Sequence, residues 1–356
     1  MEIWTNWDPL KEVIVGNCET TSNLNIHPES KKLFDKILKE TKEDLDFLAK
    51  TLQKLDVTVW RPKPLSLQSI QLHDFKIKNP TFPIVPRDQY FVYGKSIYQT
   101  YTSMPDRFFD GMSYYEIFCD LYKRGFNWIS QPPPLLKDFD DSTSWWSEPN
   151  YRYNNVLKDQ ILWHTATMFK CGDSLIVNQK GPGNFLGYDW IKRNIECEIF
   201  ENKGTHCDSF GHIDHGFFMS NDDTVFSLSD WLPNVLENKN VIELDNIVQK
   251  IPYEVLVEIG QNYEKKGGRY SFDWLQSWLT EWRGYIQEVC FDTNVLVVDS
   301  HNIIFSNVQP KLFKIMENMN INCIVCPIRH GLFWESGIHC LTLDIVRHGN
   351  KRKIIH

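Results

Sequence analysis

The sequence predicts an α/β protein built from a repeated unit, with the repeats arranged around a shared centre. Short apolar, β-branched runs of strand length recur along the chain, and most are followed by an amphipathic helical stretch. Five such units occur at intervals of roughly 50 to 80 residues, and no unit would bury its own apolar face alone. The same alternation also permits an ordinary doubly wound α/β sheet.

The predicted elements follow one another in a regular order. Turn residues frame the strand-like runs at residues 13–16, 90–98, 174–178, 224–228 and 294–299. Amphipathic stretches predict helices at residues 30–55, 113–124, 188–194 and 310–319. Several of these helices lead into a further strand, as at residues 57–60 and 321–326. We find no Pro/Gly/Ser-rich linker, so residues 1–356 are predicted to form a single domain.

Composition narrows the class of protein. The 356 residues carry 38 basic and 46 acidic side chains, a net charge of −8, which disfavours nucleic acid as a partner. No stretch approaches the roughly 18 apolar residues of a membrane span, and the first residues do not read as a signal peptide. Nine cysteines, an odd number, are scattered without a disulfide spacing. We therefore expect a soluble protein of the reducing cytoplasm.

Two cysteine motifs are candidates for a metal site or a catalytic nucleophile. Cys323 and Cys326 form a single CxxC with no second pair at metal spacing, so a core strand is the better interpretation and no metal or cofactor is predicted. Cys340 is predicted to lie in an extended, β-type run after a small-residue turn. A thiol with a pKa of about 8.5 needs a basic or cationic neighbour to act as a nucleophile. Adjacent strand residues point to opposite faces, so His339 should face away from the Cys340 sulfur and the partner must come from elsewhere.

A second candidate is the pair His212 and Asp214. If residues 211–216 form a strand, these two side chains share one face and present a general acid/base beside a carboxylate. Taken alone, a His-x-Asp is more commonly a solvated turn. Asp88, just before the strand-like run at residues 90–98, would by itself be a turn or cap residue.

Taken together and in order, these motifs resemble the glycine (arginine:glycine) amidinotransferase family, within the guanidine-modifying (pentein) enzymes. The resemblance covers nearly the whole chain, although each motif alone is weak. The motifs are NWDPLKEVIVG at residues 6–16, VTVWRP at 57–62, VPRD at 85–88 followed by RFF at 107–109, FLGYDW at 185–190, HID at 212–214, IR at 328–329 and GIHCLTLD at 337–344.

The resemblance implies a five-bladed, pseudo-symmetric α/β propeller (the pentein fold) of ββαβ repeats. It further implies that Cys340 attacks the guanidino carbon of the donor and that His212 protonates the departing amine. The amidino group then waits on sulfur for an acceptor amine. Asp88 and Asp214 would be the carboxylates that hold the guanidinium, and Arg107 and Arg329 in neighbouring motifs would be further substrate-binding residues. The implied partners are small amino and guanidino compounds, no cofactor is implied, and a homodimer is possible.

Three departures from the family pattern predict altered substrate recognition. The family carries a further active-site aspartate before the strand of the central repeat, and His164 occupies that position here. The family's carboxylate-binding arginine is missing, and the matching position falls near Trp231. The glycine-rich approach to the cysteine reads WESG at residues 334–337, which introduces Glu335. We therefore count His164, Trp231 and Glu335 among the substrate-binding candidates.

Three functions remain open at this point. The first is an amidinotransferase with a changed donor or acceptor that serves a specialised biosynthetic route. The second uses the same Cys/His machinery as an acyl or thioester transferase or hydrolase on a substrate without a guanidino group. The third is a binding protein on the same scaffold. The aromatic content of 14% fits a large rigid core or an aromatic pocket.

Overall fold

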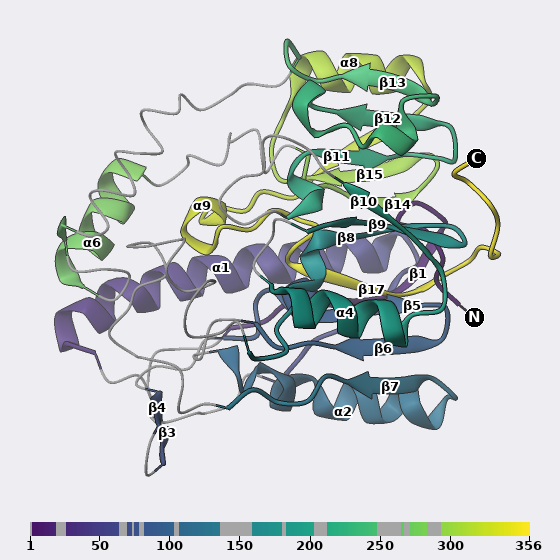
Figure 1. The fold of residues 1–356 in the computed structure, drawn as a ribbon. Helices are drawn as coiled ribbons and strands as arrows, with labels where there is room; N and C mark the ends of the chain where they lie inside the picture. The colour runs from purple at the N-terminus through teal and green to yellow at the C-terminus, as the bar shows by residue number, and fades with distance from the viewer. Residues whose placement is uncertain are drawn as a thin grey trace.

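The structure is a computed structural model that describes most of the chain. The described residues are 2–18, 26–63, 70–72, 75–77, 82–102, 107–135, 159–179, 183–202, 212–247, 265–266, 271–282 and 293–356. Among them, five three-stranded sheets are accompanied by helices (Figure 1). No helix in these ranges is long and apolar enough to cross a membrane.

Four of the sheets follow the same plan along the chain. In each, the first two strands form an antiparallel hairpin and the third strand returns parallel to the second. The second sheet comprises β5 (Tyr90–Tyr93), β6 (Ser96–Gln99) and β7 (Asn127–Ser130), and the third comprises β8 (Met168–Cys171), β9 (Ser174–Asn178) and β10 (Glu198–Asn202). The fourth comprises β11 (Phe217–Met219), β12 (Thr224–Ser227) and β13 (Asn240–Glu243), and the fifth comprises β14 (Leu296–Asp299), β15 (Asn302–Phe305) and β16 (Asn322–Val325).

The first sheet joins the two ends of the chain. The C-terminal strand β17 (Thr342–Arg347) pairs antiparallel with β1 (Leu10–Val15), and β1 pairs parallel with β2 (Thr58–Trp60). Strand β17 thus takes the place that the first hairpin strand has in the other sheets. Both chain ends accordingly lie on the same side of the molecule (Figure 1).

Apolar clusters connect each sheet to the next one around the ring. The shared clusters pair Ile14 and Leu343 with Tyr90 and Val92, Phe91 and Tyr98 with Met168 and Leu175, Phe169 and Ile176 with Phe217 and Val225, Phe226 with Val297 and Ile303, and Leu296 and Ile304 with Val13 and Val15. The last pairing closes the circle between the fifth and first sheets. The predicted five-unit repeat architecture is therefore confirmed, and the doubly wound alternative is wrong because the strands form separate small sheets.

Helices connect the second and third strands in four of the five units. They are α1 (Pro28–Lys54), α2 (Asp110–Lys123), α4 (Phe185–Asn194) and α8 (Pro310–Asn318). Proline at the first position starts α1 and α8, where no backbone N–H is needed. The Asn184 side chain caps α4 by accepting a 2.8 Å hydrogen bond from the Gly187 backbone. In the fourth unit, two 3₁₀ helices, Ser229–Trp231 and Asn234–Leu236, take the place of the helix.

The remaining elements lie outside the five repeats. They are the hairpin of β3 (Ile70–Leu72) and β4 (Phe75–Ile77), helix α6 (Phe272–Ser277) with its π-helical continuation Trp278–Trp282, and the short helix α9 (Gly331–Trp334). Trp274 and Trp278 pack in the core beside α1, and the Trp278 indole donates a 2.9 Å hydrogen bond to His330.

Burial falls from the centre of the ring to its rim. Every residue of β5, β8, β11 and β17 is buried, whereas the third strand of each unit carries exposed or half-buried positions. Strands buried on both faces read as continuous apolar runs, which explains why the sequence shows runs instead of alternation. The run at residues 90–98 is two strands, because Gly94 adopts a positive φ of 58° and turns the chain into a hairpin.

Candidate active site

Chain segments from all five units meet at the centre of the ring. Each lies immediately before the first strand of its unit: the 3₁₀ helices Pro86–Asp88, Thr165–Thr167 and Ile213–His215, the pair Thr293 and Asn294, and the turn that carries Cys340. The three 3₁₀ helices pack against one another in order, and the first of them also contacts β17. The pseudo-symmetry therefore brings together residues that are far apart in sequence.

Cys340 lies in a turn directly before β17, so the extended conformation expected from the sequence is wrong. Its side chain is 1% exposed, and the Leu341 backbone N–H closes the turn onto the Gly337 carbonyl at 3.1 Å. Asn294 holds this turn from the neighbouring unit: its Oδ1 accepts from the Cys340 backbone at 3.0 Å, and its Nδ2 donates to the sulfur at 3.1 Å. The amide of Asn294 thereby fixes the position of the thiol.

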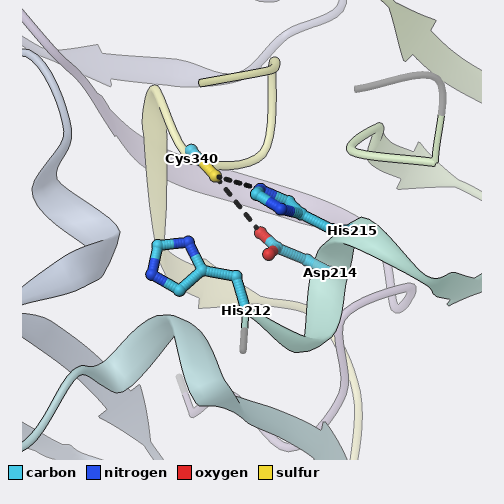
Figure 2. Close-up of side chains that lie close together, drawn as sticks. All are labelled: His212, Asp214, His215 and Cys340. Atoms are coloured by element: carbon cyan, nitrogen blue, oxygen red, sulfur yellow. Dashed lines mark hydrogen bonds between the residues drawn. The ribbon is translucent and has the colours of Figure 1, made fainter. Parts of the chain in front are cut away.

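The Cys340 sulfur faces a carboxylate and an imidazole. Its Sγ lies 3.6 Å from Asp214 Oδ2 and 3.8 Å from His215 Nε2 (Figure 2). Burial raises the pKa of the Cys340 thiol to about 12, the Asp214 charge adds to this, and the contact with His215 opposes it. The thiol is therefore protonated at neutral pH while no cation occupies the site.

His339 shares the same carboxylate oxygen. Its Nδ1 lies 2.6 Å from Asp214 Oδ2, so His339 contacts the carboxylate that also faces the sulfur, and residues 338–341 form a turn where an extended run was predicted. Burial, with Arg87 nearby, lowers the pKa of His339 to about 4 although Asp214 opposes this. Burial also disfavours ionised Asp214, but the bond from His339 and the surrounding imidazoles hold the pKa of Asp214 below its usual range. A neutral His339 therefore donates to an ionised Asp214.

His212 directly precedes the 3₁₀ helix Ile213–His215, so the predicted strand across residues 211–216 is wrong; Gly211 lies outside the described residues. The tighter turn still gathers its polar groups on one side. One donor atom from each of His212, Asp214, His215 and Cys340 lies within 4.8 Å of the others. Figure 2 shows the four side chains close together, with Cys340 facing His215 and Asp214.

A second group, Asp88, His164 and His212, lies against the first. Donor atoms of these three residues are also within 4.8 Å of one another, and His164 Nδ1 lies 3.1 Å from His212 Nε2. Only one of two facing nitrogens can carry the hydrogen. Burial lowers the pKa of His164 to about 3, against the pull of Asp88, so His164 is neutral at pH 7.

The neutral state of His164 fixes its role whenever His212 is protonated. A protonated His212 carries hydrogen on both nitrogens, so His164 Nδ1 accepts and the His164 hydrogen lies on Nε2. Within the described part of the chain, that Nε2 is buried without a hydrogen-bond partner. His164 thus offers a donor at a position where the sequence resemblance implies a carboxylate.

Arg107 lies behind Asp88 as its ion-pair partner. It pairs with Asp88 Oδ2 and donates to Asp110 Oδ2 at 3.0 Å and to the Val85 carbonyl at 2.7 Å. Burial disfavours ionised Asp88, yet Arg107 and the nearby histidines lower the pKa of Asp88 from its usual value. Asp88 Oδ1 has no hydrogen-bond partner among the described residues. The structure therefore assigns Arg107 to Asp88, where the sequence had suggested a substrate contact.

The other predicted substrate residues occupy different places. Arg329 pairs with Asp44 at 2.8 Å and with Glu43 at 2.8 Å on α1, and none of its contacts in the described chain reaches the cluster. Trp231 packs on the segment that carries His212, because a Cβ added to Gly216 would lie 2.2 Å from its ring. Glu335 ends α9 in the left-handed conformation, with a φ of 54°.

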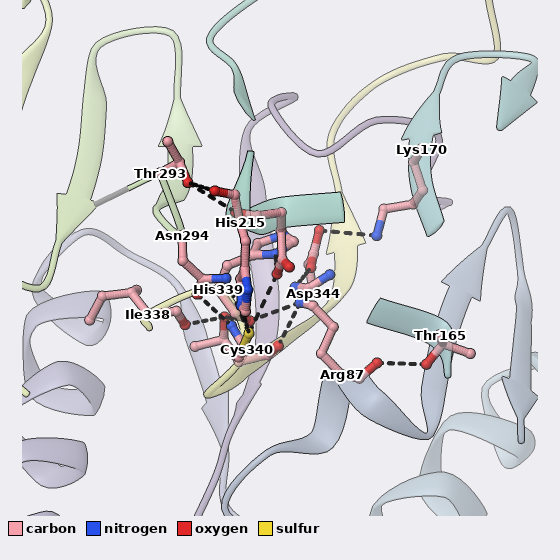
Figure 3. Close-up of polar contacts among 12 residues, drawn as sticks. Arg87, Thr165, Lys170, His215, Thr293, Asn294, Ile338, His339, Cys340 and Asp344 are labelled. Atoms are coloured by element: carbon pink, nitrogen blue, oxygen red, sulfur yellow. Dashed lines mark hydrogen bonds and ion pairs between the residues drawn. The ribbon is translucent and has the colours of Figure 1, made fainter. Parts of the chain in front are cut away.

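Sequence reasoning missed a buried ion network beneath the Cys340 turn. Arg87 donates from Nε to the His339 carbonyl at 2.8 Å and to the Thr342 carbonyl at 3.1 Å, and its Nη2 pairs with Asp344 (Figure 3). Lys170, 3.3 Å from Asp344, is fully buried, and this burial lowers the pKa of Lys170 to about 7. In the sequence, the position of Arg87 next to Asp88 in the VPRD motif was the one feature that could have indicated this network.

Comparison with known proteins shows which proteins this chain resembles. No model of a protein family matches the chain. Among curated proteins, inosamine-phosphate amidinotransferase 1 of Streptomyces griseus is 24% identical over 377 residues, covering 98% of this chain and 97% of the relative. Mitochondrial glycine amidinotransferase of Xenopus tropicalis is 24% identical over 386 residues, covering 97% and 82% respectively.

Solved structures agree on the fold. The inosamine-phosphate amidinotransferase StrB1 of Streptomyces griseus superimposes with a TM-score of 0.73 at 21% identity, covering 100% of this chain and 99% of that one. SxtG, an amidinotransferase from Microseira wollei in the saxitoxin biosynthetic pathway, superimposes with a TM-score of 0.72 at 19% identity, covering 99% of each chain.

The fold is therefore the five-bladed α/β propeller predicted for a guanidine-modifying enzyme of the pentein group. The predicted resemblance to the amidinotransferases is confirmed over nearly the whole chain.

Proposed function

We propose that this protein is a cysteine-dependent, amidinotransferase-like enzyme that moves an amidino group from a guanidino donor to an acceptor amine. One observation carries the proposal: the buried Cys340 thiol lies among carboxylates that suit a planar cation. Asp88 Oδ1 and Asp214 Oδ1 are buried and have no hydrogen-bond partner among the described residues. A guanidinium presents N–H groups in a fixed fork that carboxylates accept well.

The first half-reaction forms a covalent amidino-Cys340. Arrival of the guanidinium beside the sulfur favours the thiolate, because an opposite charge stabilises the ionised form. The thiol proton passes to His212, sulfur bonds to the guanidino carbon, and the carbon–nitrogen bond to the donor amine breaks as His212 returns a proton to that nitrogen. In the second half-reaction the acceptor amine attacks the same carbon, the carbon–sulfur bond breaks, and His212 takes the proton from the amine and returns it to the Cys340 thiolate.

Substrate recognition is where we propose that this chain differs. His164 is neutral and offers an N–H donor, whereas a carboxylate would attract a guanidinium. We propose that the donor substrate presents a hydrogen-bond acceptor, such as a carbonyl, hydroxyl or phosphate oxygen, to His164. The similarity to an enzyme of inosamine-phosphate metabolism and to one of saxitoxin biosynthesis supports a place in specialised biosynthesis.

The decisive experiment is intact-mass analysis of the pure protein after incubation with arginine and a panel of substituted guanidines. We expect a gain of one amidino group that is released by an acceptor amine such as glycine. The adduct should be absent in Cys340→Ala and retained in Cys171→Ala, which removes another buried thiol. Absence of an adduct with every guanidino donor would contradict amidino transfer.

Neutral His164 also favours a second candidate, the acyl or thioester chemistry that the sequence left open. A carbonyl oxygen could accept from His164 Nε2 while Cys340 attacks the carbonyl carbon. The same mass experiment with activated esters and thioesters tests this. An acyl adduct on Cys340 without any amidino adduct would favour this alternative.

The organisation of the enzyme is part of the proposal. We propose that residues 1–356 act as one domain, which the pairing of β1 with β17 supports. Its substrates would be small molecules, with neither nucleic acid nor membrane as a partner. The seven described cysteines are all free thiols, which supports a cytoplasmic enzyme; Cys207 and Cys290 lie outside the described residues. A homodimer stays a prediction.

A further inference from the structure

The cluster around Cys340 contains one more donor group than amidino transfer uses. Sulfur, carboxylate and one imidazole suffice for the chemistry above, yet His215 places a second imidazole 3.8 Å from the sulfur. We propose that His212, Asp214, His215 and Cys340 form a binding site for one divalent transition-metal ion, Zn²⁺ above all, which holds the thiol in an inactive state. The four side chains are buried, and their donor atoms lie within 4.8 Å of one another.

The two contacts of the sulfur have the spacing of ligand atoms in a tetrahedral zinc site. Zinc binds sulfur at about 2.3 Å and histidine nitrogen or carboxylate oxygen at about 2.0 to 2.2 Å, so its ligand atoms lie roughly 3.5 Å apart. The sulfur is 3.6 Å from Asp214 Oδ2 and 3.8 Å from His215 Nε2. All four ligand atoms lie within 4.8 Å of one another, so side-chain rotations that move an atom by about 1 Å would bring the whole set onto one ion.

The charges favour a divalent cation. A thiolate and a carboxylate together neutralise a charge of +2, which leaves a neutral complex in a buried site. Outer partners are also present: His339 Nδ1 contacts Asp214 at 2.6 Å, and His164 Nδ1 contacts His212 at 3.1 Å. Such outer contacts orient metal ligands and raise affinity. The ligand set of one sulfur, two nitrogens and one oxygen fits zinc or cobalt better than magnesium or calcium.

Metal binding has a defined proton balance. The S–H bond of Cys340 breaks, a metal–sulfur bond forms, and the proton leaves to solvent. Affinity should therefore rise about tenfold for each pH unit while the thiol is the group that must ionise. Occupancy would also shield the sulfur from alkylation and from substrate. This inference depends on the geometry of the cluster and not on the proposed function.

Cobalt titration of the metal-free, full-length protein tests the site. We expect one equivalent of Co²⁺ to produce a near-ultraviolet thiolate-to-metal absorption band together with visible bands of tetrahedral cobalt. Zinc should displace the cobalt and abolish both. Cys340→Ser should remove the thiolate band, and His215→Asn should weaken binding at least tenfold. Cys323→Ser and the exposed-histidine variant His301→Asn are the matched controls, and both should bind as the wild type does.

His215→Asp provides a second variant in case asparagine perturbs the fold, because a carboxylate keeps a metal-binding oxygen at the position. It should recover binding over His215→Asn. The proposal is overturned if no thiolate band forms, or if Cys340→Ser or His215→Asn binds cobalt as the wild type does. Amidino-adduct formation is measured separately in metal-free protein, so failure of one proposal leaves the other standing.

Discussion

Acidification should destabilise the protein through its buried central histidines, and His164 is the clearest case. Burial lowers the pKa of His164 to about 3 from the usual 6.5. Between about pH 3 and pH 6.5, His164 is therefore protonated in the unfolded chain but neutral in the folded protein. The stabilising contribution is complete above about pH 6.5 and is lost as pH falls through that window.

The size of the loss follows from the pKa difference. Each pH unit within the window costs up to about 1.4 kcal/mol per histidine, so a change from about pH 7.5 to about pH 5 should cost about 2 kcal/mol through His164. The pKa of His339, lowered to about 4, predicts a similar loss. Urea denaturation followed by tryptophan fluorescence at the two pH values gives the free energies of unfolding.

The decisive comparison is between the wild type and His164→Asn. The variant removes the titrating group, so its loss of stability between the two pH values should be about 2 kcal/mol smaller, whatever its stability at pH 7.5. His301→Asn controls for removal of an exposed histidine. An identical loss in His164→Asn and the wild type would refute the assignment of His164 as a buried neutral imidazole.

Three further predictions concern the supports of the site. Arg87→Lys should lower the free energy of unfolding by about 3 kcal/mol, measured by urea denaturation, because two buried carbonyls next to Cys340 lose their donor. Asn294→Ala should slow iodoacetamide labelling of Cys340 about tenfold near pH 8, because the thiolate loses its amide donor; an unchanged rate would contradict this. Gly216→Ala should cost about 2 kcal/mol and reduce turnover, because its Cβ would collide with Trp231; normal stability and turnover would show that the contact yields freely.

Much of the fold could be predicted because buried strands appear in the sequence as apolar runs and helices as amphipathic stretches. The runs at residues 174–178 and 224–228 form β9 and β12, and the helix at residues 310–319 forms α8. Ring closure could not be derived from such local patterns, since the pairing of Val15 with Thr342 joins opposite ends of the chain. The split of residues 90–98 depends on the conformation of one glycine, Gly94.

The candidate site shows a different limit. The resemblance correctly suggested that Cys340, His212 and Asp214 lie together, but strand alternation gave the wrong local geometry, because a 3₁₀ helix and a turn occupy these positions. Asn294 and His215 were missed, since their contacts with Cys340 span 46 and 125 residues of sequence. A polar residue at the start of a strand carries no local sign of such a partner.

The shared sheet of β1 and β17 also makes the position of Cys340 depend on a strand that contributes no side chain to the cluster. The Cys340 turn directly precedes β17, which pairs with β1 from Leu10 to Val15, and the Gly16 backbone N–H donates a 2.9 Å hydrogen bond to the Leu341 carbonyl. The turn that carries the thiol is thus held by backbone bonds to β1. A substitution that weakens the pairing of β1 with β17 would therefore displace Cys340 from Asp214, although it alters no residue of the cluster.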